Sequence, residues 1–168
     1  MDIDIRLARI DDRLIHGQVA TAWSKQTGIN RIIVVSDEVA EDELRKFLLK
    51  EASPLGIRSN IISVSRMIDV YRSGLLREEK VMLLFTNPSE VVTLVKAGIS
   101  LTSVNIGGMR FTEGKKMITN FVSVDDKDVE AFLYLANQGI ELEIRKVPSN
   151  PKIYLVELLG KEKFKKLV

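Results

Sequence analysis

The chain has 168 residues, 45% of them hydrophobic and 29% charged, which is enough for one domain with a substantial core. Its 25 basic and 23 acidic residues leave a net charge of +2, which argues against a large basic face for nucleic acid. The lack of cysteine excludes disulfides, thiolate metal sites and iron–sulfur clusters, and the single histidine, His16, excludes a metal site built from several histidines.

The first half of the chain alternates between predicted strands and helices. Alternating apolar residues predict a strand over 3–10, and a helix follows over 17–27, where Gly28 closes it. Continuous apolar runs predict buried strands at 32–35 and 81–85, and a β-branched run predicts another at 57–64. Helical spacing of apolar residues predicts helices at 41–51 and 65–72.

The second half continues the alternation and then varies it. Pro88 opens a predicted helix over 88–95, and a short strand follows at 104–106. A strand is predicted at 117–124, a helix capped by Asp125 runs to 136, and a last strand at 142–147 precedes a terminal helix at 153–159. Apolar strands separated by amphipathic helices predict a single α/β domain over 1–168, with a mainly parallel open sheet, helices on both faces and one antiparallel strand.

The chain shows no targeting or membrane segment. Its first residues alternate charged and apolar side chains, and no apolar run approaches the roughly 18 residues of a transmembrane helix. We therefore expect a cytoplasmic protein, with neither a metal nor an organic cofactor. Trp23 is expected to pack in the core or at an interface, so Trp23 and the terminal helix are candidate contacts for a homo-oligomer.

Ligands of open parallel sheets bind outside the carboxyl ends of the strands, so the segments that follow the strands are the candidate site. The segment after the first strand is the richest, with two carboxylates, a guanidinium and the imidazole of His16 just before a helix. The segments after the other strands supply a candidate rim, which consists of Ser36, Asp37, Thr86, Gly107, Gly108, Met109 and Arg110.

The segment before the first helix suits an anionic ligand. A helix start offers unpaired amides, here at Gly17 and Gln18, and the positive end of a dipole. Arg13 can bind phosphate oxygens with two nitrogens, and Asp11 or Asp12 could hold either Arg13 or the second imidazole nitrogen. This set fits phosphoryl transfer through a phosphohistidine at His16, in which positioning and charge carry most of the catalysis.

A string of residues from this segment resembles the active-site loop of a known family. It is similar to the IIB components of the mannose/fructose/sorbose family of the bacterial sugar phosphotransferase system. The residues that carry the resemblance are Arg9-Ile10-Asp11-Asp12-Arg13-Leu14-Ile15-His16-Gly17-Gln18-Val19, Val35-Ser36-Asp37-Glu38-Val39-Ala40, Asn105-Ile106-Gly107-Gly108-Met109 and Glu143-Ile144-Arg145-Lys146-Val147-Pro148.

The resemblance implies a function. It implies that His16 accepts a phosphoryl group through Nδ1 from the phosphohistidine of a separate IIA protein. His16 would then pass the group to a hexose taken up through the membrane IIC–IID complex, and Arg13 would contact the phosphoryl group. The separate roles of Asp11 and Asp12 and the identity of the sugar stay open. Ser36 stands where the family often has Asn.

Two alternatives remain from the residues themselves. A response-regulator receiver domain also has an acidic pair after its first strand and a hydroxyl such as Thr86. A receiver domain needs an aspartate after the third strand and a lysine after the fifth. This chain has Ser63-Val64-Ser65 and Gly107-Gly108 at those places. The second alternative is a non-catalytic phosphate- or nucleotide-binding module. The sequence has none of the glycine-rich strings that usually bind phosphate in such modules. Covalent labelling of His16 separates both from a phosphocarrier.

Overall fold

The computed structural model of the protein describes residues 3–160. Its main sheet contains β1 (Asp4–Asp11), β2 (Arg31–Val35), β3 (Arg58–Ile62), β4 (Lys80–Phe85), β5 (Ser103–Gly108), β8 (Glu141–Ile144) and β9 (Ile153–Tyr154). The helices are α1 (Gly17–Thr27), α2 (Asp37–Ala40), α3 (Glu43–Glu51), α4 (Val64–Ser73), α5 (Pro88–Lys96), α6 (Asp126–Asn137) and α7 (Leu155–Gly160). The predicted domain, 1–168, includes residues 1–2 and 161–168, which lie outside the described part of the chain.

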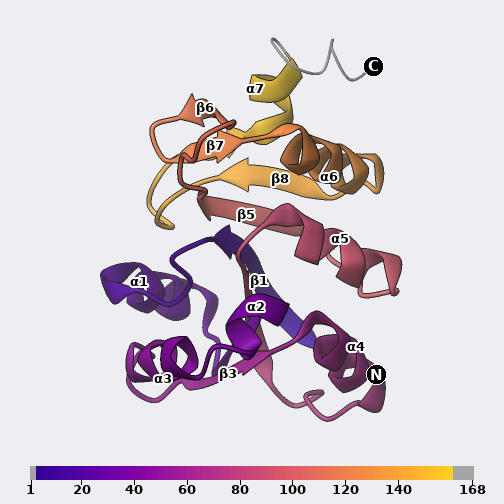
Figure 1. The fold of residues 1–168 in the computed structure, drawn as a ribbon. Coiled ribbons are helices and arrows are strands. Elements are labelled where there is room, and N and C mark those ends of the chain that lie inside the picture. Colours follow the sequence, from indigo (N-terminus) through magenta and orange to yellow (C-terminus); the bar gives the residue numbers. More distant parts are fainter. Residues whose placement is uncertain (1–2, 161–168) are drawn as a thin grey trace.

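The main sheet has the strand order β3-β2-β4-β1-β5-β8-β9. Every pair is parallel except β8 with β9, so the predicted α/β fold with one antiparallel strand is confirmed. Helices α1 and α3 cover one face and α4, α5 and α6 the other (Figure 1). Strand β1 lies in the middle, and the chain adds strands first on one side of it and then on the other. The carboxyl end of β1 is therefore the switch point at which such sheets bind ligands.

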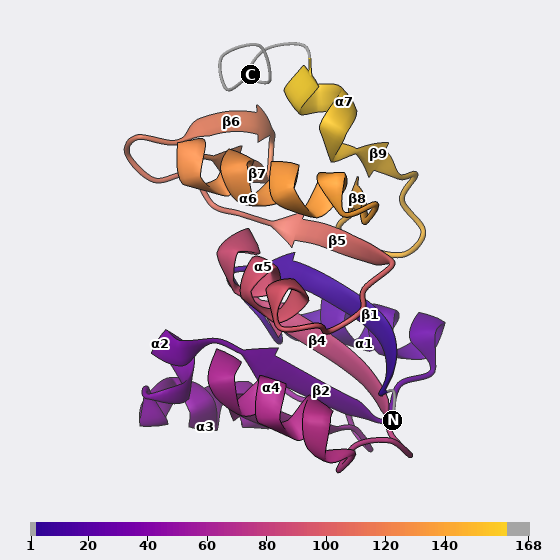
Figure 2. The ribbon, with the colours of Figure 1, turned by 90° about the vertical axis from the view of Figure 1, so that its right-hand side faces the viewer.

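Each face of the sheet has its own apolar core, because successive residues of a strand point to opposite faces. Ile33 and Leu83 pack under α4 and α5, whereas their neighbours Ile32 and Met82 pack under α1 and α3. Continuous apolar strands are thus buried on both sides, as the sequence predicts. The carboxyl ends of the parallel strands meet at one edge, toward which the arrowheads of β1 and β5 point in Figure 2.

The structure corrects several predicted boundaries in the first half of the chain. The helix predicted at 41–51 begins at Glu43, because the side chain of Asp42 accepts a hydrogen bond from the amide of Arg45 and caps it. The short helix α2 before it was not predicted. The strand predicted at 57–64 ends at Ile62, because Ser63 caps α4 in the same way.

Further corrections fall in the second half. The single strand predicted at 117–124 is a hairpin, β6 (Lys116–Thr119) and β7 (Val122–Val124), separate from the main sheet. Strand β5 extends to Gly108, strand β8 stops at Ile144, and the terminal helix begins after β9. Within residues 3–160, no helix is long and apolar enough to cross a bilayer.

Candidate phosphoryl-transfer site at the end of strand β1

The loop between β1 and α1 is held in an uncommon conformation by its own buried side chains. Leu14 has a φ of 60°, in the left-handed region that non-glycine residues rarely adopt, and Gly17 has a φ of 44°. Leu14 and Ile15 are 2% and 3% exposed in the core under α1, and this burial offsets the backbone strain of about 1–2 kcal/mol at Leu14. The loop therefore presents the residues on either side of this buried pair, Arg13 before it and His16 after it, at the carboxyl edge of the sheet.

His16 is the N-cap residue of α1, yet its side chain does not cap the helix. The imidazole instead turns back, where Nδ1 lies 2.9 Å from the carbonyl oxygen of Leu14. Its other nitrogen, Nε2, is buried without a hydrogen-bond partner and lies 3.8 Å from a carboxylate oxygen of Asp11. The helices α2 to α6 are each capped by a side chain at their first residues, namely Ser36, Asp42, Ser63, Asn87 and Asp125. The first-turn amides of α1 lack such a cap, so they are suited to an anion.

Asp11 is the centre of the site. Its carboxylate is fully buried and accepts hydrogen bonds from the amide of Arg13 at 3.1 Å and from the Arg13 guanidinium at 3.2 and 3.3 Å. It also accepts one from the guanidinium of Arg9 at 2.9 Å. The Arg13 side chain is about half exposed (51%), whereas that of Arg9 is 2% exposed. Of the two cations on Asp11, only Arg13 can therefore reach a ligand outside the loop.

Asp12 has a structural role that differs from that of Asp11. Its side chain accepts a hydrogen bond from the amide of Arg110 at 2.7 Å, and its amide donates to the carbonyl of Gly108 at 3.2 Å. Its own carbonyl accepts one from the guanidinium of Arg45, on α3, at 3.2 Å. Asp12 thus ties the loop to the end of β5 and to α3, and it makes no bond to His16.

The two glycines of the predicted rim lie within β5 rather than in a turn after it. A side chain at residue 107 would collide with the guanidinium of Arg9. A β-carbon at residue 108 would lie 3.2 Å from Asp11 and 3.3 Å from Arg13, tighter than ordinary contact. Both glycines therefore make room for the charged groups of the site. At Gly17 the reason is the backbone angle, because a β-carbon there would meet open space.

The remaining predicted residues fall into two groups. Ser36, Asp37 and Thr86 bond to helix starts: Ser36 caps α2, Asp37 accepts from the first amide of α4 at 2.9 Å, and Thr86 donates to Glu90 at 2.9 Å. No hydrogen bond among the described residues joins them to His16. Met109 fastens the hairpin to β5 through backbone bonds to residues 121 and 123, and Arg110 and Gln18 are exposed.

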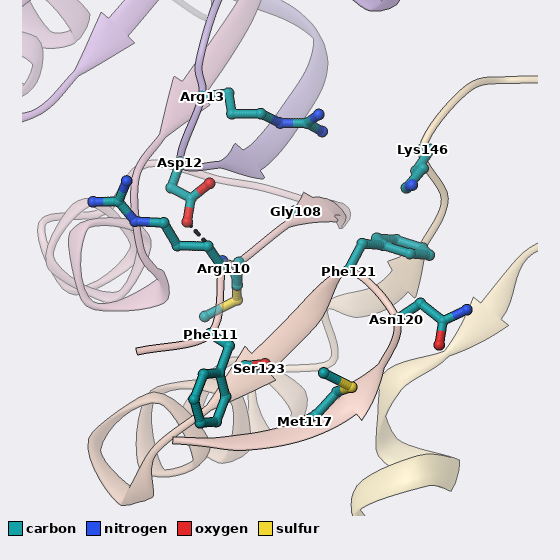
Figure 3. Close-up of a pocket in the computed structure, with 11 residues that line it drawn as sticks. Asp12, Arg13, Gly108, Arg110, Phe111, Met117, Asn120, Phe121, Ser123 and Lys146 are labelled. Carbon is teal, nitrogen blue, oxygen red and sulfur yellow. Dashed lines mark hydrogen bonds between the residues drawn. The ribbon is translucent and has the colours of Figure 1, made fainter. Parts of the chain in front are cut away.

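A pocket of about 360 Å³ adjoins the loop on its hairpin side (Figure 3). Figure 3 shows Arg13 extending toward the side where Lys146 lies, with the ring of Phe121 beside Lys146. The ammonium of Lys146 lies 4.7 Å from the centre of that ring. Phe111 and Met117 on the pocket wall are more than half exposed. Lys146, the hairpin and its aromatic side chains were not predicted as part of the site.

Sequence reasoning also missed a buried polar layer behind Asp11. Arg9 donates to the side chain of Asn105 and to the carbonyl of Arg145, and Asn105 donates to Glu143 at 3.0 Å. Burial lowers the pKa of Arg9, and the neighbouring Asp11 opposes this shift. The sequence signal that could have revealed this layer is Arg9 itself, a charged residue in the first strand between two core residues, Ala8 and Ile10.

Trp23 closes this polar layer from the side of α1. Trp23 is 2% exposed, and two guanidinium groups lie against its ring, that of Arg9 at 5.4 Å and that of Arg145 at 5.1 Å from the ring centre. Its ring nitrogen donates to the carbonyl of Lys146 at 2.9 Å. Of the two places expected for Trp23, core or interface, the side chain occupies the core.

Comparison with known proteins places the chain in a family. Residues 5–167 match the family model of the PTS system sorbose subfamily IIB component. The chain is 51% identical over 162 residues to the sorbose-specific EIIB component of Lacticaseibacillus casei, covering 94% of this chain and 99% of that protein. It is 55% identical over 157 residues to the mannose-specific EIIAB component of Escherichia coli K12, covering 94% of this chain but 49% of the relative, so it spans about half the length of that protein.

Solved structures agree with the sequence comparison. The crystal structure of the IIBSor domain of the sorbose permease from Klebsiella pneumoniae superposes with a TM-score of 0.94 at 42% identity, covering 96% of this chain and 99% of the other. The N-acetylgalactosamine-specific IIB component 1 from Escherichia coli gives a TM-score of 0.85 at 35% identity, covering 90% and 99%. The chain belongs to the sorbose subfamily of IIB components of the phosphotransferase system.

Proposed function

We propose that the protein is a phosphocarrier, which takes a phosphoryl group from the phosphohistidine of a IIA protein onto His16 and passes it to a hexose. The observation that carries the proposal is the position of the single histidine. It stands at a helix start without a side-chain cap, with Asp11 behind its ring and Arg13 in reach of solvent. The acceptor sugar would be presented by a membrane IIC–IID complex, and the protein would act in the cytoplasm beside it.

The first transfer would proceed by attack of Nδ1 of His16 on phosphorus. The nitrogen–phosphorus bond of the donor breaks and leaves its electron pair on the donor imidazole. A carbonyl can only accept, so Nδ1 carries the ring proton while it faces Leu14. Before attack, Nδ1 must leave that carbonyl and lose its proton to solvent while Nε2 gains one. The Nε2 proton would then point to Asp11 and fix the ring, as a carboxylate fixes histidine in a catalytic triad. The second transfer reverses these roles, because a sugar hydroxyl loses its proton and attacks phosphorus while His16 keeps the electron pair.

The charge of the phosphoryl group would be met by Arg13 and by the first amides of α1. Arg13 is bonded to Asp11 in the present arrangement, and its half-exposed side chain can turn from the carboxylate to the incoming phosphoryl oxygens. The amides of α1 are already directed outward and need no rearrangement. Both groups favour charge at the same place, next to the ring of His16.

The test is covalent labelling. With phosphoenolpyruvate, the general phosphotransferase proteins and a cognate IIA protein, the chain is expected to gain one acid-labile, alkali-stable phosphate, and His16→Ala is expected to gain none. Thr86→Val is the matched control, because it removes the hydroxyl that a receiver domain would use and leaves the His16 loop untouched. Full labelling of His16→Ala would refute the proposal, and reversible phosphate binding without labelling would favour a binding module.

The choice of ring nitrogen can be tested on the same sample. Because the chain has one histidine, its nitrogen NMR signals need no assignment among several rings. We expect the phosphorus to be attached to Nδ1. Attachment to Nε2 would mean that Asp11 does not orient the ring in the reacting state.

A further inference from the structure

Arg9 lies behind the site and cannot touch a partner protein, since its side chain is 2% exposed. The guanidinium nevertheless donates three hydrogen bonds. It donates to Asp11 at 2.9 Å, to the side chain of Asn105, and to the carbonyl of Arg145 at 3.0 Å. Trp23 covers it from α1 at 5.4 Å. These contacts come from β1, β5, the segment after β8 and α1, so the guanidinium has one position.

The sheet has room for this guanidinium only because residue 107 is glycine. A β-carbon at Gly107 would occupy the place of the Arg9 nitrogens, although Gly107 has no positive φ that would itself require glycine. Glycine inside a strand weakens it, and it commonly marks a close approach of another group. Here the group that approaches is the guanidinium of Arg9.

The two cations on Asp11 differ in their freedom. Removing the counter-ion of a buried carboxylate is strongly unfavourable, because the charge is left without water or a partner. If Arg13 were the single cation on Asp11, its departure to a phosphoryl group would leave that charge buried and uncompensated. Arg9 stays on Asp11 whichever way Arg13 turns, because its own contacts hold it in place.

We propose that Arg9 is a positioning residue for phosphoryl transfer: it is the permanent counter-ion of Asp11, and it thereby releases Arg13 to move between the Asp11 carboxylate and the phosphoryl group. This inference rests on the proposed function of His16. Arg13 is the cation that moves between Asp11 and the phosphoryl group, and Arg9, four residues before it in the sequence, is the cation that stays on Asp11.

The experiment compares Arg9→Met with Arg31→Met in the transfer from the IIA protein. Arg31 is the matched control because its guanidinium also bonds to a carboxylate, that of Glu79 at 2.8 Å, and to the side chain of Asn60. It stands at the amino end of β2, away from the carboxyl edge where His16 lies. We expect kcat to fall about ten- to a hundredfold in Arg9→Met with KM for the IIA protein unchanged, since a misplaced reacting group slows chemistry rather than docking. We expect Arg31→Met to keep both constants.

Two more variants distinguish positioning from general loss of structure. Arg9→Lys keeps a cation beside Asp11 and is expected to recover most of kcat, whereas Gly107→Ala, which displaces the guanidinium without removing it, is expected to resemble Arg9→Met. If Arg9→Met does not fold, Gly107→Ala carries the same comparison with Arg31→Met. An unchanged kcat in Arg9→Met, or an equal loss in Arg31→Met, would overturn the inference while leaving His16 labelling intact. Absence of labelling in the unaltered chain would overturn the proposed function itself.

Discussion

The face of the sheet under α1 has an apolar half and a polar half, and a single row of residues across the strands passes from one to the other. From β3 to β4 the row consists of Ile61, Val34 and Leu84, and from β1 to β8 it continues with Arg9, Asn105 and Glu143. Each of the six is at most 6% exposed. Burial is thus equal in the two halves, whereas the chemistry changes completely between β4 and β1.

The difference shows what burial does in each half. In the apolar half it removes hydrocarbon from water, which stabilises the fold at roughly 25 cal/mol for each Å². In the polar half it removes charges from water, which is unfavourable unless every charge is paired. The pairing is close to complete, and the layer orients the site, because Arg9 holds Asp11 and Asp11 in turn holds Arg13. We therefore expect changes in the apolar half to alter stability alone, and changes in the polar half to alter the rate of phosphoryl transfer as well.

The largest expected effect is in the apolar half. Ile32→Ala removes a fully buried side chain under α1 and should lower the free energy of unfolding by about 2–5 kcal/mol, because it leaves a cavity. Urea unfolding measures this loss. The rate of His16 labelling per folded molecule should stay the same. A slower rate in molecules that remain folded would mean that the two halves are not separate in function.

The next effect is in the polar half. Asn105→Leu removes the acceptor of one Arg9 N–H and one of the two donors to an oxygen of Glu143, which keeps its bond from Arg145. We expect a loss of about 1–3 kcal/mol in stability together with slower labelling. The matched variant is Asn60→Leu, which removes a similar amide from Arg31 outside the polar layer. The comparison between the halves breaks down if both variants slow labelling equally.

Arg13→Lys should change rate alone. Lysine keeps the charge but loses the two-pronged fit to phosphoryl oxygens, so we expect transfer to slow by about tenfold, or roughly 1.4 kcal/mol. Stability should be unaffected, because the side chain is half exposed. Rapid-quench kinetics and thermal unfolding measure the two quantities, and an unaltered transfer rate would remove Arg13 from the site.

The smallest effect concerns pH, and it lies on the face opposite α1, at the start of α5. Burial raises the pKa of Glu90 above its ordinary value of 4.5, although three hydrogen bonds from Thr86 and Asn87 oppose the shift. The folded state then binds this proton more tightly than the unfolded state. Stability supplied by the bound proton is therefore present below about pH 4.5 and is lost as pH rises through the raised pKa.

Glu90→Gln keeps the accepting oxygen and cannot ionise. We expect the unaltered chain to lose stability relative to Glu90→Gln as pH rises from about 4 toward neutrality. Urea unfolding at several pH values measures the difference, with Glu43→Gln as a control because that carboxylate is 86% exposed. A difference that does not vary with pH would contradict the assignment.

Most of the fold could be predicted because its strands are short apolar runs and its helices carry caps that are visible in the sequence. The failures have local causes. The run 117–124 is apolar on both sides of the turn at Asn120 and lacks a glycine or proline there, so it resembles one strand. Strand β8 stops at Ile144 because the carbonyl of Arg145 accepts from the side chains of Arg9 and Asn105, and because Val147 bonds to Asn150 in a turn.

The site could be predicted where it is continuous in sequence and, because Gly107 and Gly108 end a predicted strand, at these two glycines. The loop from Asp11 to Gly17 carries its own signal, because its residue types suit an anion and stand before a helix. The polar layer joins β1, β5 and β8, which are about 40 to 135 residues apart, and its hydrogen bonds depend on which strand lies beside which. Arg9 and Asn105 face each other only through the register of β1 with β5, and no local pattern contains that register.

The glycine at position 107 also restricts how this sequence can change over generations. A side chain at 107 fits only if the guanidinium of Arg9 leaves its place, whereas a smaller residue at 9 is compatible with glycine at 107. A side chain that arrives first at 107 therefore separates Arg9 from Asp11, and we expect a lineage that replaces both residues to change residue 9 first. The order of mutation thus links two codons that are almost a hundred positions apart.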